Sequence, residues 1–168
     1  MKLQTLDDVF TEQLADLYSA ERQLVQALPK VAGSAHTEEL KKALDEHLEE
    51  TRTHVTRLEE IFQHLPNTVD EEHCKAMEGL LAEGEEIVEA DGDPTARDAA
   101  LIAAAQRVEH YEIAAYGTAK TLAEQLGYDR AEELLKETLD EEANADKLLT
   151  KIATGGLFSG GVNEQAAN

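Results

Sequence analysis

The stretch AAAQRVEHYEIAAYGTA, residues 103–119, places charged residues in the middle of an alanine-rich segment. Alanine has the highest helix propensity, so the stretch predicts a helix. On that helix Glu112 falls on the same stripe as Val108 and Ala115, and Glu109 shares the face because it precedes Glu112 by three residues. A lone buried carboxylate costs several kcal/mol, and burial raises its pKa. The segment therefore requires something that compensates two inward carboxylates.

Signals for helix starts and stops divide the chain into four long helices and one shorter one. Asp93 and Pro94 suit an N-cap and a first helical position, and Gly127 suits a C-cap, so they bound the helix that contains the opening stretch. Thr5 and Asp8 have the spacing of a capping box. The predicted helices are 5–33, 37–64, 70–90, 94–126 and 129–154, with Asp129 and Glu132 as caps of the last.

The connections between these helices predict how the chain folds. Residues 33–36 and 127–129 are short links, which force antiparallel hairpins, whereas residues 66–94 can carry the chain along the molecule. Two hairpins joined by one long crossover indicate an all-α, ferritin-like four-helix bundle with an extra shorter helix in the crossover. We expect residues 1–154 to form this bundle and residues 155–168 to form a flexible C-terminal tail, because the tail has little apolar content.

Composition excludes several classes of function. The chain has 168 residues, which suits one domain, and its formal net charge of −21 argues against nucleic acid as a partner. Its acidity indicates a solvated helical surface, or alternatively a saline habitat. The longest apolar run, residues 99–105, is far shorter than the ~20 residues of a membrane helix, so we expect no membrane association. The single Cys74 and the absence of a secretory signal favour the cytoplasm.

Each of the four long helices carries polar residues near the middle of its apolar stripe. The first stripe is interrupted at Glu21, the third at Glu112 and the fourth at Glu142, and the second is polar at His47, Thr51 and His54. The interruptions lie at similar distances from the hairpin turns, which places them within about one helical turn of the same level. Divalent cations compensate clustered carboxylates most strongly, and carboxylates with imidazole suit iron and manganese. A two-metal site in the core is therefore the favoured interpretation over separate surface or core side chains.

Four stretches of the chain resemble the YciF-like bacterial stress proteins. They are DLYSAERQL (16–24), HLEET (47–51), RDAALIAAAQRVEHYEIAAYGTAKTLAEQLGY (97–128) and LLKETLDEE (134–142). The resemblance covers nearly the whole chain except the tail. It implies a ferritin-like bundle, a role in stress responses and a homodimer, whereas the biochemical activity of that family is poorly defined.

A more distant resemblance links the chain to rubrerythrin-type di-iron proteins. It implies metal-ligand roles for Glu21, Glu50, Glu109, Glu112 and Glu142, with Glu50 as a bridging carboxylate and Glu109 and Glu112 as a Glu-x-x-Glu pair.

The departure from that pattern concerns the histidines. The rubrerythrin-type proteins have Glu-x-x-His on their second and fourth helices, whereas Thr53 and Ala145 stand at those positions here. His47 and Asp146, each one turn from a predicted ligand, are expected to substitute, and His54 is a further candidate that the resemblance does not single out.

The sequence supports two main hypotheses of function. In the first, the protein is a stress-defence protein whose core holds two iron ions, or alternatively manganese, that react with peroxide or dioxygen. In the second, it is a non-catalytic stress protein with an empty site; an iron-storage cage is a weaker third. The expected metal ligands are Glu21, His47, Glu50, Glu109, Glu112, Glu142 and Asp146. Tyr18 and Tyr116 are expected to direct their hydroxyls at polar partners, and His110 to face outward.

Overall fold

The chain folds into helices that account for nearly all of its regular structure. The computed structural model describes residues 3–66, 72–156 and 159–167. The elements are α1 (Leu6–Ser34), α2 (Glu38–His64), α3 (Lys75–Val88), α4 (Pro94–Leu126), α5 (Asp129–Thr154), β1 (Gly155–Gly156), β2 (Ser159–Gly160) and α6 (Val162–Ala166). The prediction of an all-α protein with four long helices and one shorter helix between the second and third is confirmed. The predicted start of the shorter helix, at residue 70, lies outside the described residues.

Local capping explains where the longest helix begins and ends. The Asp93 carboxylate accepts hydrogen bonds from the backbone of Thr95 and Ala96, both at 2.9 Å, and Pro94 is the first helical residue. Gly127 ends α4 in the left-handed conformation, with φ of 74°. The capping box of α1 is also present. These predicted helix ends are confirmed, because caps depend on residues that are adjacent in the sequence.

Two helix starts differ from the sequence prediction. Asp129 is the first residue of α5 rather than its cap, and Tyr128 occupies the N-cap position. Thr37 caps α2 by position only, because its side chain makes no capping hydrogen bond. The buried carboxylate of Asp98 on α4 instead accepts from the backbone of His36 at 2.8 Å and of Thr37 at 2.7 Å. A tertiary contact therefore fixes the two residues that immediately precede α2.

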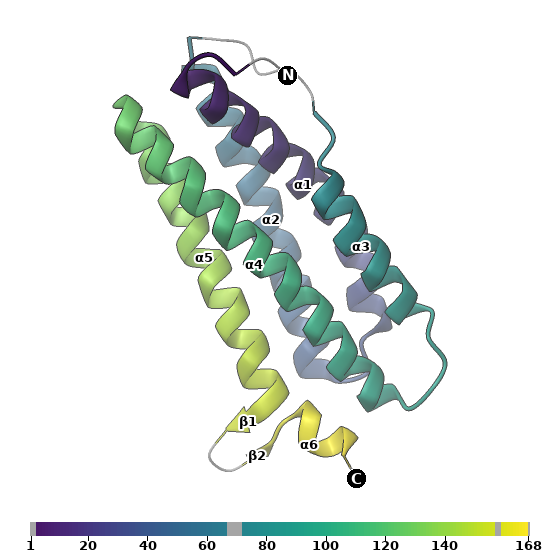
Figure 1. Ribbon diagram of the computed structural model, residues 1–168. Coiled ribbons are helices and arrows are strands. Elements are labelled where there is room, and N and C mark those ends of the chain that lie inside the picture. The colour runs from purple at the N-terminus through teal and green to yellow at the C-terminus, as the bar shows by residue number, and fades with distance from the viewer. Residues whose placement is uncertain (1–2, 67–71, 157–158, 168) are drawn as a thin grey trace.

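The four long helices lie side by side along one axis (Figure 1). α1 contacts α2 and α4, and α5 contacts the same two helices from the other side. The crossover between α2 and α4 contains α3, which packs against α1 and α4. The apolar core consists of two separate clusters, one toward the α1–α2 turn and one toward the α4–α5 turn. Polar side chains from all four long helices separate the two clusters.

The tail packs more than its composition predicts. β1 and β2 form a two-residue antiparallel pair, and α6 contacts α4 and α5. Val162 is buried and belongs to the core cluster near the α1–α2 turn. Within residues 159–167, Val162 therefore anchors the segment on the bundle, while the flexibility expected of residues 155–168 stays a prediction.

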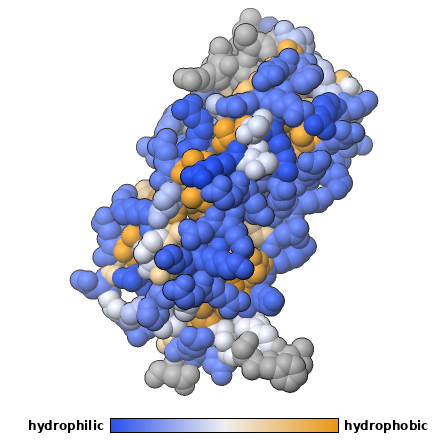
Figure 2. Space-filling model, turned by 180° about the vertical axis from the view of Figure 1, so that it is seen from behind, coloured by the Kyte–Doolittle hydropathy of each residue, from blue (hydrophilic) through white to orange (hydrophobic). Residues whose placement is uncertain are grey.

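The surface follows the acidic composition. On the face opposite to that of Figure 1, hydrophilic residues predominate and apolar residues show only in small separate areas (Figure 2). Among the described residues, no helix is both long enough and apolar enough to cross a membrane.

Candidate metal centre

The layer between the two apolar clusters contains buried ionisable side chains from each long helix. They form the polar layer: Glu21 of α1, His47 and His54 of α2, Glu109 and Glu112 of α4, and Glu142 of α5. Four of these six side chains are 0% exposed, namely Glu21, His54, Glu112 and Glu142. Each sits where the apolar stripe of its helix is interrupted, so the helical period directs all of them toward the same space.

The first half of the layer, which we call the His54 group, comprises Glu21, His54 and Glu142. The Nδ1 atom of His54 lies 3.3 Å from Oε1 of Glu21 and 3.0 Å from Oε1 of Glu142. The hydroxyl of the fully buried Tyr116 donates a hydrogen bond to Oε1 of Glu21. The three ligand-type atoms of this group lie within 4.8 Å of one another, a spacing suited to one metal ion.

The second half, which we call the His47 group, comprises His47, Glu109, Glu112 and Glu142. The Nε2 atom of His47 lies 3.5 Å from Oε1 of Glu109 and 4.0 Å from Oε2 of Glu142. One ligand-type atom from each of the four residues falls within the same 4.8 Å limit. Glu142 belongs to both groups and offers Oε1 to one and Oε2 to the other, as a carboxylate that bridges two metal ions does.

A further carboxylate lies behind each imidazole, on the side away from the polar layer. Nε2 of His54 lies 2.9 Å from Glu141, whose carboxylate also forms a two-pronged ion pair with Arg57. Nδ1 of His47 lies 3.7 Å from Glu50. A carboxylate behind a histidine fixes the ring and makes its other nitrogen a better metal ligand. His54 has this arrangement, whereas Nδ1 of His47 makes no hydrogen bond to Glu50 and has only the charge of that carboxylate nearby. The Glu50 side chain is 49% exposed and that of Glu141 only 33%.

Most atoms of the polar layer have no hydrogen-bond partner within the protein. Among the described residues, every buried side-chain nitrogen or oxygen without such a partner belongs to this layer, apart from one atom each of Thr37 and Arg97. Both oxygens of Glu112 are included, although its side chain is fully buried. Buried polar groups are nearly always paired, so unpaired atoms concentrated at one place indicate a missing ligand. The donor set of oxygens and imidazole nitrogens fits iron or manganese.

Without a metal, burial and mutual repulsion shift the acid–base behaviour of this layer. Burial raises the pKa of Glu109 and Glu112 well above the ordinary value, and neighbouring carboxylates add to the rise for Glu112. Burial opposes protonation of the histidines, but the surrounding carboxylates outweigh it, so the pKa rises to about 9 for His47 and about 11 for His54. The metal-free layer therefore retains protons at neutral pH, and a metal ion would have to displace them.

The Glu21 and Glu142 carboxylates differ although both contact His54. Burial raises the pKa of Glu21, against the opposing effect of His54. Burial acts in the same direction on Glu142, but contact with His54 and the charge of His47 outweigh it and leave its pKa lowered. Glu142 is thus the carboxylate of the layer that stays ionised most readily, which suits the residue that both groups share.

The structure brings together five of the seven residues that the sequence predicted as ligands: Glu21, His47, Glu109, Glu112 and Glu142. Glu50 lies behind His47, because three residues along a helix turn a side chain by about 60° from the stripe. Asp146 lies one turn beyond Glu142, where it accepts from Gln106 at 3.0 Å and pairs with the exposed His110 at 3.3 Å. Neither carboxylate contributes an atom to the two groups of candidate metal ligands.

His54 is the member of the layer that sequence reasoning ranked too low. It shares the stripe of His47, seven residues earlier, and that spacing was the available signal. The α1–α2 hairpin explains why His54 lies near Glu21. Glu21 is thirteen residues before the end of α1, and Thr51 is thirteen residues after the start of α2, between the two histidines. The prediction that both tyrosine hydroxyls have polar partners is confirmed, because Tyr116 donates a hydrogen bond to Glu21 and Tyr18 donates one to Glu59.

Comparisons with known proteins agree with this architecture. Residues 5–167 match the family described as a domain of unknown function, DUF892. Protein YciF of Escherichia coli K12 is 48% identical over 169 residues, which covers 100% of this chain and 99% of YciF.

Solved structures give the same picture. The crystal structure of the E. coli stress protein YciF matches with a TM-score of 0.86 and 50% identity, covering 89% of this chain and 94% of that one. A Rhodopseudomonas palustris protein, YcfI, described as a proposed structural protein, matches with a TM-score of 0.86 and 40% identity over 90% of this chain and 97% of its own.

Proposed function

The chain belongs to the DUF892 family and is a homologue of the stress protein YciF, and from that premise we propose that it is a ferritin-like di-metal protein of stress defence. The observation that carries the proposal is the polar layer, in which unpaired buried carboxylate and imidazole atoms form two groups that share Glu142. The two antiparallel hairpins and the crossover that contains α3 support the ferritin-like assignment.

Each residue of the layer has a distinct part in holding the metals. Glu21 and His54 would bind one ion, His47, Glu109 and Glu112 the other, and Glu142 would bridge them. Glu50 and Asp146, which the sequence also suggested as ligands, would act from outside the layer. Two bound iron or manganese ions would each supply one of the two electrons that reduce a peroxide to water, or dioxygen to peroxide.

The surrounding residues orient this layer and limit its contact with water. Tyr116 donates to one oxygen of Glu21 and thereby orients its carboxylate, while the other oxygen has no hydrogen-bond partner and would be available to a metal ion. Arg57 holds Glu141, which in turn fixes the ring of His54. The two apolar clusters close the layer from both ends, which strengthens electrostatic interactions inside it. We further propose a homodimer, which the family resemblance implies, and a cytoplasmic location, which the single Cys74 favours.

Elemental analysis of the purified protein tests the proposal. We expect about two equivalents of iron or manganese per chain after anaerobic reconstitution, and a loss of at least one equivalent in Glu112→Ala. The matched control is Glu124→Ala, an exposed position on the same helix, which should retain both equivalents. Diffraction at the metal absorption edge should then place both ions in the polar layer. No bound metal after reconstitution, together with unchanged stability on metal addition, would reject the proposal.

A second candidate function is a non-catalytic structural role with an empty site. Two observations favour it: YcfI is described as a proposed structural protein, and the histidines partly neutralise the carboxylates without a metal. Under this alternative, replacing Glu112 with Leu would raise the thermal stability of the protein purified from cells, because it would remove a buried carboxyl that has no partner. Under the metal proposal, the same substitution would lower it.

A further inference from the structure

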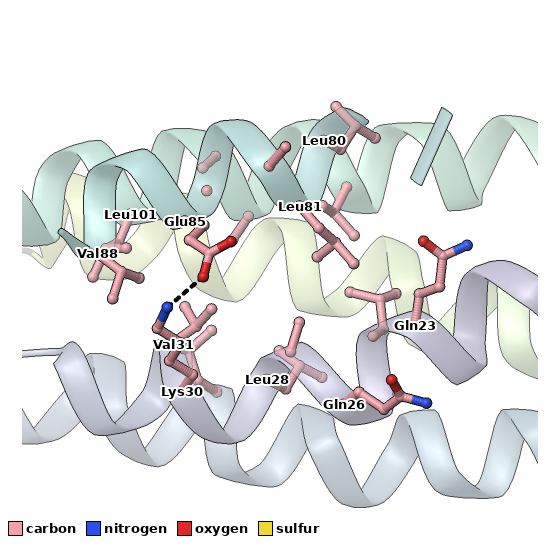
Figure 3. A pocket seen from close by; sticks show the side chains of 18 of the residues that line it. Gln23, Gln26, Leu28, Lys30, Val31, Leu80, Leu81, Glu85, Val88 and Leu101 are labelled. Atoms are coloured by element: carbon pink, nitrogen blue, oxygen red, sulfur yellow. Dashed lines mark hydrogen bonds and ion pairs between the residues drawn. The ribbon is translucent and has the colours of Figure 1, made fainter. Parts of the chain in front are cut away.

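A cleft of about 470 Å³ lies between α1, α3 and α4 and extends to the His47 group. Figure 3 shows Leu28 and Val31 of α1 on one side of it and Leu81 and Val88 of α3 on the other. We call this space the α1–α3–α4 cleft. Small-molecule sites in proteins typically have volumes of about 300–1,000 Å³, so the cleft has room for a small molecule.

The cleft exists because α3 does not fill the space that it covers. α3 is amphipathic and directs its apolar side at α1 and α4, yet Met77 is its only buried residue. Leu80, Leu81 and Val88 are only partly buried although they face the apolar core. Binding of an apolar molecule would remove this apolar surface from water, which is favourable in free energy.

The lining of the cleft favours an aliphatic molecule. Its apolar residues are Leu, Val and Ala, and none of the described lining residues is Phe, Tyr or Trp. An aromatic ligand would therefore find no ring on which to stack. An unbranched chain can follow the space between α1 and α3 and make dispersion contacts along its length.

The charges around the cleft disfavour an anion. Lys30 is the only lysine or arginine among the described lining residues, and it already pairs with Glu85 at 2.5 Å and with Glu89 at 3.6 Å. Glu78 also lines the cleft, and the whole chain carries a formal net charge of −21. A carboxylate or phosphate head group would be repelled by the lining residues Glu78 and Glu85, and at the inner end it would meet a polar layer whose four glutamates outnumber its two histidines.

The inner end of the cleft offers polar atoms to one head group. His47 and Glu109 line the cleft and are 7% and 3% exposed. Nε2 of His47 and Oε2 of Glu109 have no hydrogen-bond partner. An O–H group can donate to the carboxylate and accept from an imidazole N–H, so it satisfies both atoms.

We propose that the α1–α3–α4 cleft binds a neutral aliphatic molecule with one O–H head group, as in an alcohol or an alkyl hydroperoxide, with the head at His47 and Glu109. The head-group contacts belong to the metal-free protein, because a metal ion bound as in the proposed function would occupy the same atoms of His47 and Glu109. The inference rests on the proposed function only in making the His47 group the place where such a molecule would react once metal is bound. Binding itself depends on the cleft alone.

Calorimetry with two probes of equal chain length tests this inference in the metal-free protein at pH 7. We expect 1-octanol to bind at least tenfold more tightly than sodium octanoate. Ala105→Leu, which places a larger side chain at the lining, should weaken 1-octanol binding at least tenfold. Ala103→Leu, at an exposed position of the same helix outside the lining, should leave it unchanged. Equal or tighter binding of octanoate, or undiminished binding to a folded Ala105→Leu variant, would overturn the proposal.

A second measurement needs no variant and separates this inference from the proposed function. In the wild-type protein, nuclear Overhauser effects from the 1-octanol chain should reach the methyl groups of Leu28, Leu81 and Val88. Contacts confined to other methyl groups, or absence of binding, would reject the cleft even if two metals are found. Binding without any metal uptake would instead reject the di-metal proposal and leave the cleft intact.

Discussion

The two histidines of α2 are alike in sequence context and differ in surroundings. His54 is 0% exposed, and behind it Glu141 is fixed by Arg57, while Tyr116 secures Glu21 on the opposite side. His47 is 7% exposed, its rear carboxylate Glu50 is half exposed, and it borders the α1–α3–α4 cleft. One half of the polar layer is closed and supported, whereas the other is accessible. On the proposed function, the His54 group would hold its metal ion firmly, and the His47 group would be the one that an incoming molecule meets.

The largest expected effect concerns the residue that both halves share. Because Glu142 contributes an oxygen to each group, Glu142→Ala should reduce metal content from two equivalents to near zero. Glu21→Ala should remove only the ion of the His54 group and leave one equivalent. Elemental analysis of both variants after reconstitution measures the contrast. If each variant retained one equivalent, Glu142 would not be a bridge.

The stability of the metal-free protein should depend on pH because both histidines hold their protons more tightly in the folded state. The folded-state pKa of His47 is about 9, above the ordinary value of 6.5, so its stabilising contribution is complete below pH 6.5 and is lost as the pH rises through 9. The loss amounts to roughly 3 kcal/mol. The contribution of His54, whose pKa is about 11, also falls from pH 6.5 upward, but part of it remains at pH 9. Chemical denaturation between pH 6 and 9 should therefore show falling stability.

The raised pKa values of Glu109 and Glu112 act in the same direction, since a carboxyl that prefers its proton in the folded state destabilises the fold as the pH rises. His47→Gln should make the decline between pH 6.5 and 9 shallower. The exposed His110→Gln variant is the control and should follow the wild type. Stability that rises with pH in the metal-free protein would contradict the assignment.

Removing the carboxylate behind each histidine should have unequal results. Glu141→Gln should weaken metal binding in the His54 group by about 10–100-fold, because the ring loses its charged partner. Glu50→Gln should weaken the His47 group by only a few-fold, because water screens this exposed and more distant carboxylate. Competition with a metal chelator measures both affinities. Equal effects would show that exposure does not separate the halves.

The smallest expected effect concerns the helix that covers the open half. Gly79 lies inside α3, and a Cβ atom there would meet nothing within 4 Å. Gly79→Ala should therefore stabilise α3 by about 0.5–1 kcal/mol. Amide hydrogen exchange should slow in α3 and stay unchanged in α5. Slower exchange in both helices would mean that α3 does not open on its own.

Sequence reasoning identified most of the candidate site because the helical period is a local property. Glu21, His47, Glu112 and Glu142 each interrupt an apolar stripe, and their positions relative to the hairpin turns gave their common level. Glu50 was placed in the site by resemblance, yet rotation around α2 puts it behind His47.

The role of His54 as a candidate ligand could not be assigned from the sequence, because it depends on how α1, α2 and α5 pack together. His54 reaches Glu21 and Glu142 because the hairpin brings that turn of α2 opposite Glu21. Whether one polar residue on a stripe meets another depends on the registration of two helices, and a shift of one turn changes the partner.

The sequence by itself determined the helices, their ends at Asp93 and Gly127, and the polar interruption in each long helix, since caps and stripes depend on residues within a few positions of one another. Tertiary structure alone decided that Glu142 serves both groups, that Asp98 fixes the chain just before α2 and that α3 leaves a cleft at His47. These features arise from how helices distant in the sequence pack together, where side-chain volume and helix rotation decide which atoms meet.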